Sequence, residues 1–326
     1  MPLHIERPGT ALEHAGGPRE GLLIGLVNNM PDTALEATEM QFARLLGAAS
    51  GPLRVELRVA YLPEVPRGPE ALEFIAGNYW HVEQLTAAPL DALIVTGLEP
   101  KAANLVDEPY WRRLGELLSW AQAHTASSIW SCLAAHAAVQ QLDGIMRQRL
   151  AQKRFGVFEH NLLEGHPLLA GVATPLCLPH SRWNDLPVQE LRTAGYTLLS
   201  WASETGADMF LKQTRSLLVF LQGHPEYEPT TLLKEYRRDV GRFLRGQQPH
   251  YPTQPKGYFS AAATSQLEAF ERQARAQRTE ETLASFPVLD PDSYRGDRWA
   301  SAASQLYRNW LRLITTARRK GEAASP

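Results

Sequence analysis

The chain has 326 residues, 44% of them hydrophobic, which is enough for a substantial core in one large α/β domain or two small ones. Its 33 basic and 35 acidic side chains nearly cancel without a dense basic stripe, so nucleic acid is not expected as a partner. Two cysteines, with no Cys-x-x-Cys or His-Glu-x-x-His pattern, support neither a disulfide framework nor a metal site. The longest apolar runs are only as long as a strand, so no membrane span is expected.

The ends of the chain differ from its middle. Residues 1–20 carry scattered charges, Pro and Gly without an apolar core, which predicts a flexible arm rather than a signal peptide and, by default, a cytoplasmic protein. Residues 21–317 are interpreted as a single domain, because no linker is long enough to force a split. Residues 318–326 are predicted to form a disordered tail.

Strands and helices alternate along the first half of the chain. In chain order, the hydrophobic pattern predicts a strand at 22–27, a helix at 34–48, a strand at 55–62, a helix at 79–85, a strand at 90–95 and a helix at 109–124. Asp107 is the predicted cap of the last of these helices. A β-prone run then ends at Cys132, and an Ala-rich helix follows directly.

Beyond Pro175 the pattern contains more strands, before the chain ends in helices. Strands are predicted at 197–202, 208–212 and 216–221, and helices at 230–244, 261–276 and 299–317. Alternating strands and helices favour an α/β fold with a mostly parallel sheet, helices on both faces and a helical C-terminal extension. In such sheets, ligands bind at the carboxyl ends of the strands.

Three chemistry-bearing segments fall at predicted strand ends. Cys132 lies between a strand and a helix, where a thiol is exposed on a sharp turn and the helix dipole favours its thiolate. His224 and Glu226 follow another strand and offer a base with a carboxylate to orient it, while Gly97 follows a third. The alternatives are a buried structural thiol, which is the usual state of a free Cys, and an ordinary His-Pro-Glu turn.

Several separated motifs, in order, resemble one family. They are Ile94-Val95-Thr96-Gly97, Cys132, Phe155-Gly156-Val157-Phe158-Glu159-His160, Pro179-His180-Ser181-Arg182, Gly223-His224-Pro225-Glu226-Tyr227 and Glu235-Tyr236-Arg237-Arg238-Asp239. The chain is similar here to the homoserine O-acyltransferases, also called homoserine O-succinyltransferases, which have the class I glutamine-amidotransferase-like fold. The likeness covers roughly residues 20 to 250, and Asn309-Trp310-Leu311 resembles a C-terminal element of the family.

The resemblance implies a ping-pong transfer of an acyl group from acyl-CoA to L-homoserine, in methionine biosynthesis, by a homodimer without a permanently bound cofactor. It implies that Cys132 is the acylated nucleophile, His224 the general base and Glu226 the residue that orients it. The implied substrate contacts are Lys153, Ser181, Arg238 and Glu235, and the implied oxyanion donors are backbone N–H groups near Gly97, Leu98 and Leu133.

Some of these positions have simpler explanations. Arg238 is the expected partner of the substrate α-carboxylate, but among neighbouring arginines it is also typical of a solvated helix face. Glu235 either holds the α-ammonium group or is an i, i+3 partner of Arg238. Lys153 lies in a basic run that is typical of a solvated surface. His136 is expected to pack within its helix, and Cys177 to be structural.

The sequence departs from the family after Gly97. The position that is Gly in succinyl users and Glu in acetyl users aligns with Lys101, and Leu133 replaces a common aromatic residue. A cation near the acyl pocket favours a terminal carboxylate, so succinyl-CoA is the expected donor. Acetyl-CoA as donor and serine as acceptor remain open, as do a glutaminase and a catalytically silent relative.

Overall fold

The computed structural model describes residues 3–9, 21–163, 165–295 and 298–324, with side chains described as far as residue 320. Within these ranges the larger sheet contains nine strands: β1 Leu3–Glu6, β2 Leu22–Val27, β3 Val55–Tyr61, β4 Trp80–His81, β5 Ala92–Val95, β6 Ser127–Ser131, β9 Thr197–Leu198, β12 Met209–Gln213 and β13 Leu217–Leu221. The smaller sheet contains β7 Gln148–Leu162, β8 Leu176–Asp185, β10 Ser200–Ala202 and β11 Gly206–Ala207.

The α-helices of the described chain are α1 Leu35–Ser50, α2 Pro69–Asn78, α3 Val82–Ala87, α4 Trp111–His124, α5 Leu133–Asp143, α6 Val188–Thr193, α7 Thr231–Leu244, α8 Ala261–Ala276 and α9 Ala300–Ala324. Short 3-10 helices lie at Asp32–Ala34, Leu105–Asp107, Pro167–Leu169, Glu280–Ser285 and Pro291–Ser293. None of the helices in the described ranges is long and apolar enough to cross a membrane.

The larger sheet is mostly parallel, in the order β1-β3-β2-β5-β6-β13-β12-β9, with β4 paired to the end of β3. Every pairing from β1 to β13 is parallel, and only β12 and β9 run antiparallel to their neighbours. The predicted α/β class with a mostly parallel sheet is confirmed. As a result, the carboxyl ends of the adjacent strands β5, β6 and β13 lie side by side.

Alternate residues of the central strands face two different helical layers. In β2, Leu22, Ile24 and Leu26 belong to one apolar cluster, which includes residues of α1 and α9. Leu23 and Val27 belong to a second cluster, which includes residues of α4 and α5. This period of two, with both faces buried, is why the strand reads as a continuous apolar run.

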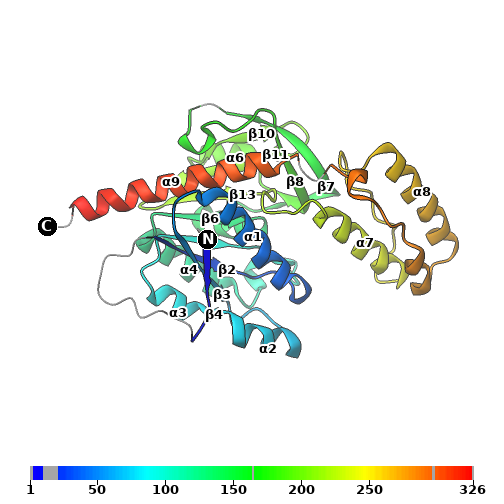
Figure 1. The fold of residues 1–326 in the computed structure, drawn as a ribbon, viewed down its shortest axis with the longest axis horizontal. Coiled ribbons are helices and arrows are strands. Elements are labelled where there is room, and N and C mark those ends of the chain that lie inside the picture. Colours follow the sequence, from blue (N-terminus) through cyan, green and yellow to red (C-terminus); the bar gives the residue numbers. More distant parts are fainter. Residues whose placement is uncertain (1–2, 10–20, 164, 296–297, 325–326) are drawn as a thin grey trace.

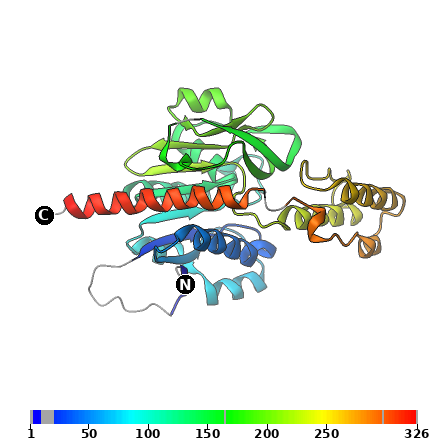
Figure 2. The ribbon, with the colours of Figure 1, turned by 45° about the horizontal axis from the view of Figure 1, so that its top comes forward.

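The helices beyond β13 complete the molecule. Figure 1 shows α7 and α8 forming a lobe at one side, while the smaller sheet lies along one edge of the larger one. The long α9 returns across the molecule and packs against α1 (Figure 2). The predicted C-terminal helical extension is therefore confirmed, and it covers one face of the sheet.

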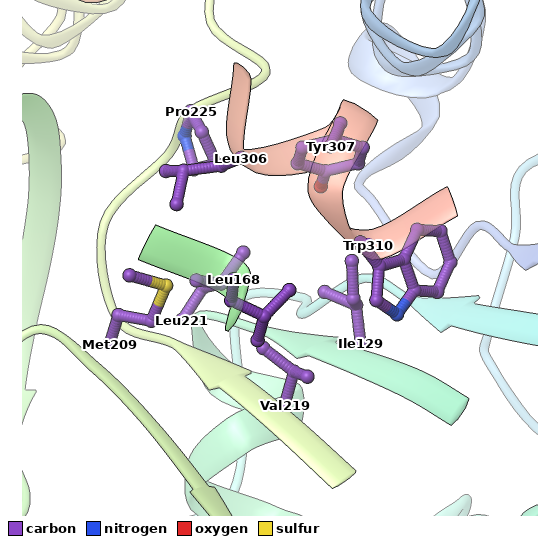
Figure 3. A pocket seen from close by; sticks show the side chains of 9 residues that line it. All are labelled: Ile129, Leu168, Met209, Val219, Leu221, Pro225, Leu306, Tyr307 and Trp310. Carbon is purple, nitrogen blue, oxygen red and sulfur yellow. The ribbon is translucent and has the colours of Figure 1, made fainter. Parts of the chain in front are cut away.

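A small apolar cavity lies between α9 and the larger sheet (Figure 3). It is lined by Ile129, Leu168, Met209, Val219, Leu221, Pro225, Leu306, Tyr307 and Trp310. The cavity has about 20 Å³ of space for the centre of a water molecule, so it is a packing void rather than a substrate pocket. Trp310 closes one end and donates from Nε1 to Ser127 Oγ at 2.8 Å.

The structure corrects the predicted ends of the chain. Residues 3–6 are not part of a flexible arm but form β1 beside β3, where the Glu6 carboxylate accepts a hydrogen bond from Arg58 Nε at 2.7 Å. Residues 318–324 continue α9 instead of forming a tail, and Arg318 donates to the Gly21 carbonyl at 2.6 Å. The rest of the two predicted segments lies outside the described residues, and the single domain at 21–317 stays a prediction.

Two further expectations on the first half are wrong. The helix predicted at 79–85 is only partly present: Tyr79 is the extended residue that ends α2, Trp80–His81 form β4, and the helix α3 begins at Val82. Asp107 does not cap α4: it belongs to a 3-10 helix, and α4 begins at Trp111 with Tyr110 at its N-cap. The long β7–β8 hairpin was not predicted.

Candidate active site

The thiol of Cys132 lies at a strained turn between β6 and α5. Cys132 has φ +53° and is, among the described residues, the single non-glycine residue with a positive φ. Its N–H donates to the Leu221 carbonyl at 2.7 Å, so β13 fixes the end of β6. A conformation of this kind costs about 1–3 kcal/mol and persists only where the surroundings hold it. The turn leaves Cys132 as the N-cap residue of α5, with its side chain partly exposed.

His224 and Glu226 follow β13, the strand beside β6. His224 Nδ1 lies 2.8 Å from Glu226 Oε1, which leaves Nε2 for the Cys132 side chain, with which His224 interacts electrostatically. The ring of Tyr227 stacks on the imidazole with centroids 4.3 Å apart. The structure thus brings together the three residues that the sequence placed at strand ends.

The imidazole of His224 is held in its charged form. Burial disfavours that charge, but the Glu226 carboxylate and Cys132 together outweigh burial and raise the pKa of His224 well above its usual value. The site therefore places a charged imidazole, oriented by a carboxylate, beside the Cys132 side chain at a helix N-terminus.

Gly97 allows a close approach of two backbone segments beside the thiol. A Cβ at Gly97 would lie 2.7 Å from the Leu133 backbone nitrogen. Leu133 is the first residue of α5, so its N–H has no acceptor within the helix. The loop that begins at Gly97 and Leu98 thus lies against a free helix N-terminus, as an oxyanion site requires.

A second polar cluster lies between β7, β8 and α7. Glu235 accepts hydrogen bonds from Ser181 Oγ and from Tyr227 OH. Because Tyr227 also stacks on His224, this cluster is joined directly to the imidazole. Lys153 Nζ lies 3.9 Å from Glu235 Oε2 and 4.1 Å from the centroid of the Phe155 ring.

Asp239 links the basic side chains of the second cluster. Lys153 Nζ donates to Asp239 Oδ2 at 2.9 Å, and Arg238 Nε donates to Asp239 Oδ1 at 2.9 Å. Burial alone would raise the pKa of Asp239, but Lys153 and Arg238 outweigh it and hold that pKa below its usual value. Sequence reasoning assigned no role to Asp239 or Tyr227. The available signal was their spacing: Asp239 is four residues after Glu235, and Tyr227 is three residues after His224.

The loop that carries Lys101 is held by a buried carboxylate. Glu108 Oε1 accepts from the N–H groups of Lys101 and Ala102, at 2.5 and 2.6 Å. The Lys101 side chain is exposed. Arg147, which sequence reasoning also missed, interacts electrostatically with Glu108 and Cys132, and its buried Nη1 has no hydrogen-bond partner among the described residues.

Two side chains in the predicted core lie there as expected. His136 is buried one turn after Cys132, with Nε2 2.8 Å from Gln222 Oε1, and burial lowers its pKa to about 4. His136 thus packs within α5 rather than serving as a second base. Cys177 is buried in β8, and its burial raises the pKa of the thiol.

The class of the fold is α/β, similar to that of glutamine amidotransferases. A putative GMP synthase subunit from Thermoplasma acidophilum is 12% identical, with a TM-score of 0.52 over 94% of this chain and 100% of that one. A glutamine amido transferase from Methylobacillus flagellatus is 12% identical, with a TM-score of 0.53 over 90% and 95%. At this identity the likeness shows the fold alone.

Sequence comparison identifies the family. The family profile "Homoserine O-succinyltransferase" matches residues 16–319. Proteins of that name are 46% identical in Methylorubrum extorquens, over 90% of this chain and 87% of theirs, and 48% identical in Rhodopseudomonas palustris, over 88% and 86%. A third, from Bradyrhizobium japonicum, is 45% identical over 92% and 94%. The chain belongs to the homoserine O-succinyltransferase family and is an acyltransferase, which confirms the resemblance of the motifs.

Proposed function

We propose that this enzyme transfers the succinyl group of succinyl-CoA to the hydroxyl of L-homoserine, through a succinyl-Cys132 intermediate, as a step of methionine biosynthesis. The observation that carries this proposal is the Cys132–His224–Glu226 arrangement at the N-terminus of α5. Acyl-CoA acts as co-substrate, with no permanently bound cofactor or metal, and the working form is a homodimer.

In the first half-reaction the Cys132 thiolate attacks the thioester carbonyl. One thioester replaces another, so this step has little thermodynamic penalty. The oxyanion is stabilised by the N–H of Leu133 and by the backbone at Gly97 and Leu98; loss of one such donor typically lowers the rate by about 10²–10³. The bond to the coenzyme sulfur breaks, and the His224 imidazolium gives its proton to the departing thiolate.

The second half-reaction restores the charged pair. His224, now neutral, accepts the hydroxyl proton of homoserine while the oxygen attacks the acyl carbonyl. Proton transfer of this kind contributes about 10²–10⁴ in rate. The carbon–sulfur bond to Cys132 breaks, and the thiolate again faces an imidazolium. No proton is gained or lost over the cycle, and Glu226 keeps the imidazole oriented throughout.

The second polar cluster is the proposed binding site for the amino acid. Arg238 pairs with the α-carboxylate, and the partly exposed guanidinium is available for this. Glu235 holds the α-ammonium group, since a carboxylate with two hydrogen-bond donors still has free lone pairs. Ser181 and Lys153 position Glu235 from β8 and β7. The stacked Tyr227 then fixes the distance from this site to His224.

Lys101 is the proposed determinant of the donor. Its exposed ammonium group, on a loop anchored by Glu108, favours an acyl group with a terminal carboxylate. We expect Lys101→Ala to lower the rate with succinyl-CoA relative to acetyl-CoA, measured as coenzyme A release with each donor. A wild-type preference for acetyl-CoA that Lys101→Ala leaves unchanged would contradict this role.

Intact-mass spectrometry tests the proposal directly. Incubation with succinyl-CoA alone should add the mass of one succinyl group at Cys132, and homoserine should remove it. Cys177→Ala is the matched control and should still be acylated, whereas Cys132→Ala should not. If serine removes the succinyl group as efficiently as homoserine does, serine must be included as an acceptor. Hydrolysis of glutamine without acylation of Cys132 would instead favour a glutaminase. If the protein reacts with none of the donors, a catalytically silent protein is favoured.

A further inference from the structure

A buried polar cluster lies against the Gly223–His224 backbone. It consists of His160, His180, Arg182 and Asp208, and their side chains are shielded from solvent. Arg182 Nε lies 3.3 Å from His180 Nδ1, and His180 Nε2 lies 3.4 Å from Asp208 Oδ1. Burying charges of this kind is expensive unless they are paired. None of these side chains takes part in the proposed chemistry.

The hydrogen bonds fix the protonation of His180. A guanidinium nitrogen can only donate, so His180 Nδ1 accepts from Arg182. The ring proton therefore lies on Nε2, which is 3.4 Å from Asp208 Oδ1 but lacks the geometry of a hydrogen bond. Burial, and next the Arg182 charge, lower the pKa of His180 well below its usual value, so the ring stays neutral. The result is a chain of contacts from Arg182 through His180 to Asp208.

This row of side-chain contacts ends at the backbone of Gly223 and His224. The Gly223 N–H donates to Asp208 Oδ1 at 2.7 Å, and the His224 N–H donates to the carbonyl of Pro179, the residue before His180, at 2.8 Å. A Cβ at Gly223 would lie 2.7 Å from Asp208 Oδ1 and 3.0 Å from His180 Nε2. The backbone N–H groups of Gly223 and His224 are therefore both held by hydrogen bonds to the Asp208 carboxylate and the Pro179 carbonyl.

We propose that Arg182, His180 and Asp208 are positioning residues, which fix the Gly223–His224 backbone and thereby aim the imidazole at Cys132. This inference rests on the proposed role of His224. This arrangement explains why a glycine precedes His224, because no side chain fits between the backbone and the polar cluster. It also explains why a carboxylate is buried there, since it accepts from Gly223 and lies beside the ring nitrogen Nε2 of His180.

The same side chains could in principle hold a metal ion. One ligand atom each of His160, His180 and Asp208 lies within 4.8 Å of the others. A cation there would need an unprotonated His180 Nε2 and would lie close to the Arg182 guanidinium, and His160 Nε2 is 2.8 Å from Thr205 Oγ1. The arrangement without a metal, in which Arg182 donates to His180 and Gly223 donates to Asp208, is therefore favoured over the metal site.

Alkylation of Cys132 by iodoacetamide tests the positioning role without any acyl donor. We expect Asp208→Ala and His180→Leu to move the pH profile of alkylation upward by about one unit, which is about a tenfold loss of the charged Cys132–His224 pair at lower pH. Asp208→Asn and His180→Gln keep the acceptor and the donor and should restore the profile. Asn309→Ala, which removes a buried side chain from the Leu168 and Ala170 carbonyls, is the control for general destabilisation.

Unchanged profiles in folded Asp208→Ala and His180→Leu would overturn the proposal. If neither variant folds, the wild-type protein decides the question through its ¹⁵N-histidine NMR spectrum, with His180→Gln assigning the signal. A neutral His180 protonated on Nε2 supports the proposal, and an imidazolium or the Nδ1–H tautomer contradicts it. One equivalent of a transition metal in the native mass also overturns it. Since none of these readouts requires acyl transfer, a failure of the proposed function is recognised separately.

Discussion

Cys132 is a residue whose backbone is held in an unfavourable conformation, with its side chain partly exposed. The turn is held by the hydrogen bond from Cys132 to Leu221 and by the helix that begins at Leu133. Strain of this kind is a cost to stability that the position of the proposed nucleophile requires. Stability and activity should therefore respond in opposite directions to the same substitution.

We expect Cys132→Gly to be about 1–2 kcal/mol more stable than Cys132→Ala, because glycine tolerates a positive φ and alanine does not. Both variants remove the thiol, so the comparison isolates the backbone. Urea denaturation at one pH measures the difference, and both proteins should lack acyl transfer. Equal stabilities would show that the turn at Cys132 is not strained.

Glu226 is expected to matter for catalysis through its charge. Glu226→Gln removes the carboxylate that raises the pKa of His224, so the imidazole should lose its proton at a lower pH and become free to turn. We expect kcat to fall by about 10²–10⁴, measured by coenzyme A release. Glu228→Gln, two residues further and paired with Arg44, is the control and should retain its rate. Wild-type kcat in Glu226→Gln would contradict the orienting role.

The nucleophile, base and orienting carboxylate could be proposed from sequence because their signals are local. Cys132 stands between a strand and a helix, and His224 and Glu226 are two residues apart. Asp208 carried no such signal, and the contact of Asp239 with Lys153 carried none either, since these contacts form only in the folded chain. A buried polar contact of this type depends on packing between distant segments, which neither spacing nor composition encodes.

At the scale of elements, the site is built from three adjacent parallel strand ends. β5, β6 and β13 deliver Gly97, Cys132 and His224 to one edge, because parallel neighbours end on the same side of a sheet. The alternation of short apolar runs with helices was enough to predict this edge. The geometry then depends on how closely the strand-end loops approach one another.

Gly97→Ala should disrupt that approach. The added methyl group would lie 2.7 Å from the Leu133 nitrogen, so the loop or the start of α5 must move and the oxyanion donors with it. We expect kcat to fall by about 10² or more. Gly77→Ala, in α2 with open space around the new Cβ, is the control and should leave kcat unchanged. If the Gly97→Ala enzyme keeps its activity, the loop at Gly97 does not contribute to the oxyanion site.

The parts of the fold that escaped prediction share a physical cause. β7 is 15 residues long, and much of it is partly exposed, so it lacks the apolar run that identifies a buried strand. β1 is only four residues long and is recognisable only through its pairing with β3. The central strands were predicted to within two residues because both of their faces are buried.

At the scale of the whole molecule, α9 connects the end of the chain to β6, the strand that precedes Cys132. Trp310 of α9 donates to Ser127 at the start of β6, and Ser127 in turn donates to the Leu217 carbonyl of β13. The helix therefore braces two of the three site strands at the ends opposite the thiol. Such a brace should affect stability more than chemistry.

Trp310→Phe should destabilise the protein by about 1–2 kcal/mol, because it removes a buried hydrogen bond and leaves most of the apolar contact. Thermal or urea denaturation measures this, while kcat per folded enzyme should stay the same. Trp201→Phe, at an exposed position of β10, is the control. A large fall in kcat with unchanged stability would show instead that α9 acts on the reacting groups.

The pH dependence of global stability is expected to carry the signature of buried neutral histidines. Burial lowers the pKa of His136 to about 4, below the value of about 6.5 expected when the chain unfolds. As the pH falls, the unfolded chain therefore takes up the proton first. The contribution of His136 to stability is complete above pH 6.5 and is lost progressively between about pH 6.5 and pH 4, by about 3 kcal/mol in total.

His136→Gln removes this titration while keeping a donor for Gln222 Oε1. The free energy of unfolding, measured in urea at pH 7 and at pH 4.5, should fall less in His136→Gln than in the wild type, by about 2 kcal/mol. Exposed His250→Gln should follow the wild type. His180, which is also buried, keeps its own depressed pKa in all three proteins, so some acid sensitivity remains. Equal losses in His136→Gln and wild type would mean that His136 is not held neutral, and the packing of α5 against Gln222 would need another explanation.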